Sequence, residues 1–210
     1  ATCLNTLIAT VIGTLGIIVI ASMGGYKMAR VKTRYSRFCF LFCIAPMMIP
    51  FQSFMLTLVN VATTLHINGK IWGLAIIYWG LGAPMSIFLY QGFAKGIPLE
   101  LEESALIDGC NQFQLFTRII FPMLKSCTAT VTIINVMWIW NDFLLPYLVL
   151  DLNKYKTISI AIQYMKGSYG RVDMGAVMAA LILAVIPVII FYLSCQKHII
   201  KGVAAGAVKG

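Results

Sequence analysis

Residues 100–125 carry most of the polar chemistry of this chain. Four of its seven acidic residues stand there: Glu100, Glu102, Glu103 and Asp108. The chain as a whole is 60% hydrophobic and only 11% charged. We find no serine nucleophile with a histidine base that would make a catalytic arrangement with these acids. We therefore interpret the segment as a water-exposed docking element.

The docking segment has the pattern of two short helices separated by a glycine. Pro98 is a favourable starting residue, and acids in the first turn suit the positive end of a helix dipole. Asp108-Gly109 should end this helix, because glycine adopts backbone angles that other residues avoid. A second helix should then run to Pro122, with an apolar stripe suited to the membrane surface: Phe113, Phe116, Ile119 and Ile120. A merely solvated loop would account for the acids but not for this pattern.

A second candidate site is an acid inside an apolar run. Asn141 and Asp142 stand in Trp-Ile-Trp-Asn-Asp-Phe-Leu-Leu-Pro (138–146). An ionisable group at that depth in a membrane is costly and usually faces protein or water. The pair could line a translocation path, or it could hydrogen-bond a neighbouring helix and fix its packing. The sequence leaves both interpretations open.

Other chemistries lack their motifs. The chain has no Gly-x-x-x-x-Gly-Lys-Ser/Thr phosphate loop, so we do not expect it to bind ATP by itself. Its six cysteines and two histidines show no zinc-like spacing. We expect buried, unpaired thiols and no metal site.

The elements that must position these residues are apolar helices. A membrane span takes about 20 residues, and five runs are long enough: about 4–26, 38–60, 71–94, 126–150 and 174–196. Backbone polar groups in lipid must be satisfied within the segment, so these runs predict helices. Prolines predict kinks in four of them: Pro46, Pro50, Pro84, Pro146 and Pro187. The expected fold class is an all-α, polytopic transmembrane helical bundle, a single membrane domain over residues 1–210.

The basic residues predict the orientation of these spans. Of the 16 lysines and arginines, eleven fall on the side of the docking segment and of the C-terminus, and five fall on the other side. The positive-inside rule therefore places residues 95–125 and the tail 197–210 in the cytoplasm. The net charge of +9 is then mostly a topology signal and does not indicate nucleic-acid binding. Because the first span starts at once on the outer side, we expect a further helix upstream of residue 1.

The docking segment resembles a known signature. Glu-Glu-Ser-Ala-Leu-Ile-Asp-Gly (102–109), followed by Phe121-Pro122, is similar to the EAA motif of the permease subunits of binding-protein-dependent ABC importers. Glu103 best matches the motif glutamate, Ser104 replaces its first alanine, and Ser126 stands where a second proline often lies. Trp140-Asn141-Asp142-Phe143 and the ending Ala-Gly-Ala-Val-Lys-Gly (205–210) resemble the sugar-uptake branch, specifically the smaller-partner subunit of maltose and multiple-sugar importers.

This resemblance covers essentially the whole chain and implies its fold, its partners and its site. It implies the type I importer permease fold, with five of the usual six spans here. The implied partners are a second permease, two cytoplasmic ATPase subunits that bind ATP and magnesium, an extracellular sugar-binding protein, and membrane lipid. Residues 95–125 would be the coupling loop, with these ATPase-coupling residues: Glu102, Glu103, Ser104, Ala105, Asp108, Gly109 and Cys110. The chain itself would be neither an enzyme nor a cofactor-binding protein.

Two further segments acquire roles through the same resemblance. The middle of the outer segment 151–173 would reach into the binding protein, with Tyr164, Lys166, Gly167, Ser168 and Tyr169 as docking residues. The tail would slip between the ATPase subunits. The alternative function is an ATP-independent secondary transporter or channel subunit, but such proteins usually show internal repeats and several ion-coordinating acids, which we do not find. The sequence does not identify the sugar.

Overall fold

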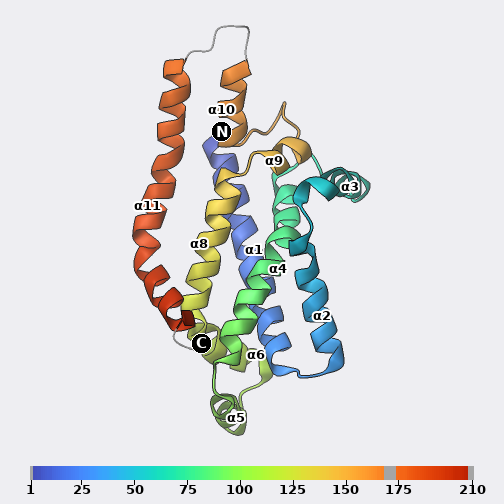
Figure 1. The fold of residues 1–210 in the computed structure, drawn as a ribbon, viewed down its shortest axis with the longest axis vertical. Helices are drawn as coiled ribbons and strands as arrows, with labels where there is room; N and C mark the ends of the chain where they lie inside the picture. Colours follow the sequence, from blue (N-terminus) through green and yellow to red (C-terminus); the bar gives the residue numbers. More distant parts are fainter. Residues whose placement is uncertain (1, 168–173, 208–210) are drawn as a thin grey trace. The chain divides into compact units, whose positions relative to one another are not determined.

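Helices form all the regular elements of the part of the chain that the structure describes. The computed structural model describes residues 2–167 and 174–207, and side chains within 2–165 and 174–195 (Figure 1). In chain order the elements are α1 (Thr2–Arg30), α2 (Arg34–Ile44), the 3₁₀ turn η1 (Ala45–Met48), α3 (Phe51–Thr64), α4 (Ile71–Lys95), α5 (Leu99–Ile107), α6 (Gln112–Gln114), the π-helical turn η2 (Leu115–Ile120), α7 (Phe121–Met123), α8 (Lys125–Asn141), α9 (Leu144–Val149), α10 (Ile158–Gly167) and α11 (Met174–Ala207).

Three of these helices are long and apolar enough to cross a membrane unaided: α1, α4 and the Met174–Cys195 part of α11. Two broken pairs, Arg34–Met48 with Phe51–Thr64 and Gln112–Met123 with Lys125–Asn141, raise the number to as many as five if each pair is one span. These counts rest on length and composition within the described residues. Helices thus occupy the five apolar runs, as bilayer physics requires.

Prolines explain where the second run breaks. Pro46 lies in η1, and Pro50 is the N-cap of α3. Proline donates no backbone hydrogen bond and pushes the residue before it out of the helical region. Ile49, which precedes Pro50, accordingly has extended backbone angles, φ −97° and ψ 121°. The run expected at about 38–60 is therefore an interrupted helix.

The fourth run also differs from a single straight helix. Just before this run, the helix pair Gln112–Met123 and Lys125–Asn141 is bent by 75°. The helix α8 ends at Asn141, and the separate short helix α9 follows, so the run does not continue as one helix to residue 150. By contrast, Pro84 and Pro187 lie inside the continuous helices α4 and α11.

The chain divides into two compact units. The first contains Ala1–Gly16, Pro50–Trp79 and Ile133–Cys195. Within it, Trp79 donates from Nε1 to the Ile12 carbonyl at 2.9 Å, and Trp140 donates from Nε1 to the Ala184 carbonyl at 3.1 Å. Inside a membrane no water is available to polar groups, so hydrogen bonds between helices satisfy them instead. The two indoles therefore join α1 to α4 and α8 to α11.

The second unit contains Ile17–Ile49, Gly80–Thr132 and Gln196–Gly210. Here α1 and α4 approach closely at Gly25, where an added Cβ would lie 2.7 Å from the Tyr90 Cβ and 3.0 Å from the backbone nitrogen of Gln91. Small residues permit this kind of close helix contact in membranes. Tyr90 is fully buried and donates its hydroxyl to the Thr128 Oγ1 at 2.9 Å, which joins α4 to α8.

Candidate functional site

The helix α5 begins where the sequence predicts, at the end of a short link after α4. Pro98 is its N-cap, with φ −59° and ψ 139°, and Glu100 and Glu102 lie in the first turn. Acidic residues in the first turn of a helix lie toward the positive end of the helix dipole, which favours negative charge there. Figure 1 shows α5 in the connection between α4 and α6.

The end of α5 is set by Gly109. Its φ is +85°, a left-handed conformation that residues with a Cβ rarely adopt. The Gly109 amide donates to the Leu106 carbonyl at 3.1 Å, and the Cys110 amide donates to the Ala105 carbonyl at 3.0 Å. These two bonds form a Schellman motif, which satisfies the last carbonyls of the helix. Asp108-Gly109 therefore ends the helix at a defined residue.

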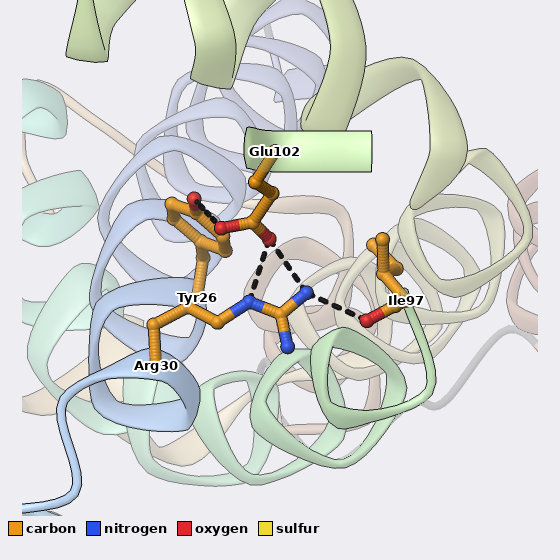
Figure 2. A network of polar contacts seen from close by, with 4 residues as sticks. All are labelled: Tyr26, Arg30, Ile97 and Glu102. Carbon is orange, nitrogen blue, oxygen red and sulfur yellow. Dashed lines mark hydrogen bonds and ion pairs between the residues drawn. The ribbon is translucent and has the colours of Figure 1, made fainter. Parts of the chain in front are cut away.

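Glu102 points into the protein and is bound by two residues of α1 (Figure 2). The Tyr26 hydroxyl donates to its Oε2 at 2.8 Å, and the Arg30 Nε donates to its Oε1 at 2.6 Å. Arg30 Nη2 also lies 2.6 Å from Oε1 and donates to the Ile97 carbonyl at 2.8 Å. One guanidinium thus binds both α5 and the link that precedes it.

The burial of this network makes it strong. Glu102 is only 8% exposed, and the Arg30 and Glu102 side chains are 15% and 11% exposed. Charge-assisted hydrogen bonds are about twice as strong as neutral ones, and screening by water and salt is weak at such a site. Ala105, one turn after Glu102, is buried on the same side. This side of α5 is therefore fixed against its own unit.

The opposite side of α5 is exposed. Glu103, Ser104 and Asp108 are exposed, and the apolar Ile107 is 85% exposed. The seven residues that the sequence groups as a docking site thus lie together but face two ways: Glu102 and Ala105 inward, Cys110 half-buried, and the others outward. The outward side of α5 thus leaves the Glu103 carboxylate and the large apolar side chain of Ile107 accessible to a partner.

The segment after α5 presents only part of the apolar stripe that the sequence predicts. A capping box between Asn111 and Gln114 starts α6, and the π-helical turn η2 then changes the helical phase. Ile120 is fully buried, and the Phe116 ring lies 5.7 Å from the Tyr26 ring. Only Phe113 is strongly exposed among the four stripe residues. Ile120 therefore belongs to the core of the second unit and not to the predicted stripe, and a membrane-surface role for the other three residues stays a prediction.

Asp142 in the first unit is held by three hydrogen-bond donors. It accepts from the Tyr78 hydroxyl at Oδ2, 2.9 Å, and from the Leu144 and Leu145 amides at Oδ1, 3.1 and 3.4 Å. Trp138 packs edge-on against the Tyr78 ring at 5.4 Å between centroids. Asp142 therefore caps the start of α9 and joins it to α4, which matches the packing interpretation of this acid.

Asn141 differs from its neighbour. It is exposed and donates from Nδ2 to the Met137 carbonyl, one turn earlier in α8, at 2.7 Å. The two residues that the sequence pairs as path candidates thus have different environments. A role for Asn141 in a translocation path stays a prediction.

The outer docking candidates are only partly within the described residues. Tyr164 lies on α10, is 43% exposed, and has the Lys156 Nζ 4.6 Å from its ring centroid, a cation–π contact. Gly167 is the last residue of α10, and the side chain of Lys166 is outside the described part. Ser168 and Tyr169 also lie outside the described residues. Within residues 2–167 and 174–207, no three His, Cys, Asp or Glu residues are grouped so that they could hold a metal ion.

Comparison with known proteins identifies the family. The family model described as "binding-protein-dependent transport system inner membrane component" matches residues 7–205. The chain belongs to this family. It is 40% identical to the probable starch degradation products transport system permease protein AmyC of Thermoanaerobacterium thermosulfurigenes over 98% of this chain and 74% of that protein. It is 36% identical to the multiple sugar-binding transport system permease protein MsmG of Streptococcus mutans over 98% of this chain and 75% of the relative.

A solved structure supports the fold of this permease. A bacterial ABC transporter involved in the import of the acidic polysaccharide alginate contains a chain that superposes with a TM-score of 0.80. The match covers 93% of this permease and 73% of that chain, at 21% sequence identity. The prediction of an all-α transmembrane bundle of the ABC importer permease kind is confirmed. The permease is an integral inner-membrane transport component, and a secondary transporter or channel is not favoured.

Arg30 and Tyr26 are site residues of this permease that sequence reasoning missed. In the sequence Arg30 is only one of the eleven basic residues of the predicted cytoplasmic side, and Tyr26 is only the last residue of the first apolar run. The sequence spacing could have indicated this site, because Tyr26 and Arg30 are one helical turn apart at the end of α1 and therefore share a face. That face needed a buried anion as partner, and Glu102 is the acid that supplies it.

Proposed function

We propose that this permease forms one half of the translocation path of an ATP-driven sugar importer. Its proposed partners are a second permease, two cytoplasmic ATPase subunits that bind ATP and magnesium, and an extracellular sugar-binding protein. ATP hydrolysis takes place in the ATPase subunits. The loop that carries α5 and the C-terminal tail lie in the cytoplasm, as the excess of basic residues on that side favours.

The observation that carries this proposal is the two-sided character of α5. Its inward side is bound to α1 through Glu102, Arg30 and Tyr26. Its outward side offers Glu103 and Ile107 to a partner. A helix that is fixed on one side and free on the other transmits the movement of a bound subunit to the membrane helices, which is what a coupling helix must do.

The transport cycle follows from this connection. The ATPase subunits close when they bind ATP and move the α5 helix that they hold. The Glu102–Arg30 ion pair and the Arg30–Ile97 hydrogen bond carry that movement to the end of α1. The interrupted and proline-containing helices then rearrange between inward-facing and outward-facing states, and the binding protein releases sugar into the path.

The substrate class is an oligosaccharide. The relatives named above are described as permeases for starch degradation products and for multiple sugars, and a third, at 34% identity, as the melibiose, raffinose and stachyose import permease MelC of Bacillus subtilis. The chain covers 75% of that last protein. We propose that residues 151–173 contact the loaded binding protein, with Tyr164, Lys166, Gly167, Ser168 and Tyr169 as docking residues. The tail 197–210 would insert between the ATPase subunits.

Reversal of the outward charge on α5 tests the proposal. Glu103→Lys should abolish co-purification of the ATPase subunits or uptake of labelled sugar, because a like charge at an interface costs several kcal/mol. Membrane insertion should persist, since no long helix is altered. The comparison variant is Glu103→Gln, which removes the same charge without reversing it and should therefore have the smaller effect on both readouts. Normal uptake and normal ATPase retention by Glu103→Lys would refute the assignment of α5 as the coupling helix.

A further inference from the structure

A cavity of about 970 Å³ opens in the second unit beside α5. It is lined by the end of α1, the start of α2, the end of α4 and the link that leads into α5. Small-molecule sites in proteins typically have volumes of about 300–1,000 Å³. The cavity is therefore large enough for a phospholipid headgroup with the first part of its chains.

The polar lining of the cavity is basic. Lys32, Arg37 and Lys95 line it, and within the described residues none of the three forms an ion pair. Arg30 also lines it, but its charge is balanced by Glu102, and Glu100 is the carboxylate in the lining. The cavity thus keeps an excess of positive charge that suits an anion.

The other part of the lining is apolar and continues onto an exposed surface. Phe40 and Leu41 of α2 line the cavity. On the same helix Phe38, Leu41 and Phe42 are 64%, 59% and 70% exposed. Inorganic phosphate has no apolar part that could bury this surface, whereas the acyl chains of a lipid would cover it. The combination of cations with an adjoining apolar helix face therefore points to an amphiphile.

The cavity also lies at the ends of two apolar helices, where the headgroup layer of a membrane is expected. It is formed at the last residues of the apolar helices α1 and α4, both of which end in basic residues, Arg30 and Lys95. Basic pockets between membrane helices on the cytoplasmic side bind anionic headgroups. Figure 2 shows that the terminal nitrogen of Arg30 not engaged with Glu102 or Ile97 points away from Glu102.

We propose that this cavity binds the headgroup of an anionic phospholipid of the cytoplasmic leaflet, with Lys32, Arg37 and Lys95 around the phosphate and the acyl chains along α2. The site goes beyond the transport function and does not depend on which sugar is carried. It adjoins the guanidinium that holds α5, so the lipid would help to order the base of the coupling helix.

The test uses the assembled transporter purified with its partner subunits. Native mass spectrometry and titration with phosphatidylglycerol in phosphatidylcholine nanodiscs measure the lipid retained and its binding constant. We expect wild type to retain phosphatidylglycerol in preference to phosphatidylcholine. A basic side chain near an anionic surface contributes about fivefold to binding. Lys32→Gln and Arg37→Gln should each lower the binding constant by about that factor, and the triple variant with Lys95→Gln by about a hundredfold.

The matched control removes three positive charges from the same unit outside the cavity: Arg34→Gln, Arg118→Gln and Lys125→Gln. This control should keep wild-type lipid binding, and size-exclusion chromatography should show intact assembly for both triple variants. Three outcomes would overturn the proposal. Both triple variants could lose lipid equally, wild type could retain no phosphatidylglycerol, or millimolar glycerol phosphate could displace the lipid, which would assign the cavity to a soluble anion.

Discussion

Replacement of Glu102 by glutamine tests how α5 is held. Glutamine keeps the length of the side chain but removes the charge that binds Arg30 and accepts from Tyr26. Hydrogen bonds to charged groups contribute about 1.5–3 kcal/mol each, and an unpaired guanidinium at a largely buried site adds a cost of its own. Glutamine can still accept one bond through its amide oxygen. We therefore expect the free energy of local opening of α5 to fall by about 2 kcal/mol.

Amide hydrogen exchange of residues 99–110 in the purified permease, without its ATPase subunits, measures this opening. A loss of about 2 kcal/mol corresponds to about thirtyfold faster exchange, since a factor of ten is about 1.4 kcal/mol. The matched control is Glu103→Gln, the same substitution one residue along, where the side chain is exposed. This control should leave exchange in the isolated permease near wild type, and should act instead on retention of the ATPase subunits.

Substitutions at the two adjacent glutamates, Glu102 and Glu103, should have separate effects. Glu102→Gln should accelerate exchange in α5 and in the Ile97 link, which shares Arg30. Arg30→Lys should accelerate it less than Arg30→Gln, because lysine keeps the charge but loses the fork that binds two groups at once. Equal exchange rates for Glu102→Gln and wild type, or equal acceleration by Glu102→Gln and Glu103→Gln, would refute the anchoring role.

Two further substitutions test the packing of each unit. Gly25→Ala should lower the apparent Tm of the purified permease and reduce its free energy of unfolding by about 1–3 kcal/mol, because the new Cβ would lie 3.0 Å from the backbone of α4. The control Gly24→Ala, whose nearest contact would be at 3.9 Å, should be neutral or stabilising. Tyr78→Phe should reduce the free energy of unfolding by about 2 kcal/mol, because the hydrogen bond to Asp142 is lost, whereas Tyr147→Phe changes an exposed side chain and should not reduce it. Equal Tm values for the two variants of either pair would contradict the corresponding contact.

The helices of this permease were largely predictable, because lipid leaves the backbone no alternative to internal hydrogen bonds. Gly109 as a helix end was also predictable, since its role depends on local backbone conformation alone. Pro46 and Pro50 predicted a kink in the second apolar run, whereas the structure has a full interruption between η1 and α3. Whether a proline kinks a helix or interrupts it depends on neighbouring packing, as the continuous helix around Pro84 demonstrates.

The direction of each side chain on α5 was not predictable in the same way. Glu102 and Glu103 have the same chemistry, and the motif comparison favoured Glu103 as the motif glutamate without saying where Glu102 points. The answer depends on the phase of α5 against α1, which is a tertiary property. The π-helical turn at Leu115–Ile120 has a similar effect, because it shifts the phase of the residues that follow and turns Ile120 inward.

The connections of α5 predict that one carboxylate matters for the coupling proposed above. The helix is joined to α4 by the chain itself, through the three-residue link 96–98, and this connection persists in any variant. Its connection to α1 depends on Glu102, Arg30 and Tyr26. Because Gly25 places α1 and α4 in close contact within the same unit, a displacement of α5 that keeps the ion pair moves both helices as a pair. Without the ion pair the same displacement acts directly on α4 only and reaches α1 solely through the packing of the two helices. Glu102→Gln should therefore leave the ATPase subunits bound and active but reduce the sugar moved for each ATP hydrolysed.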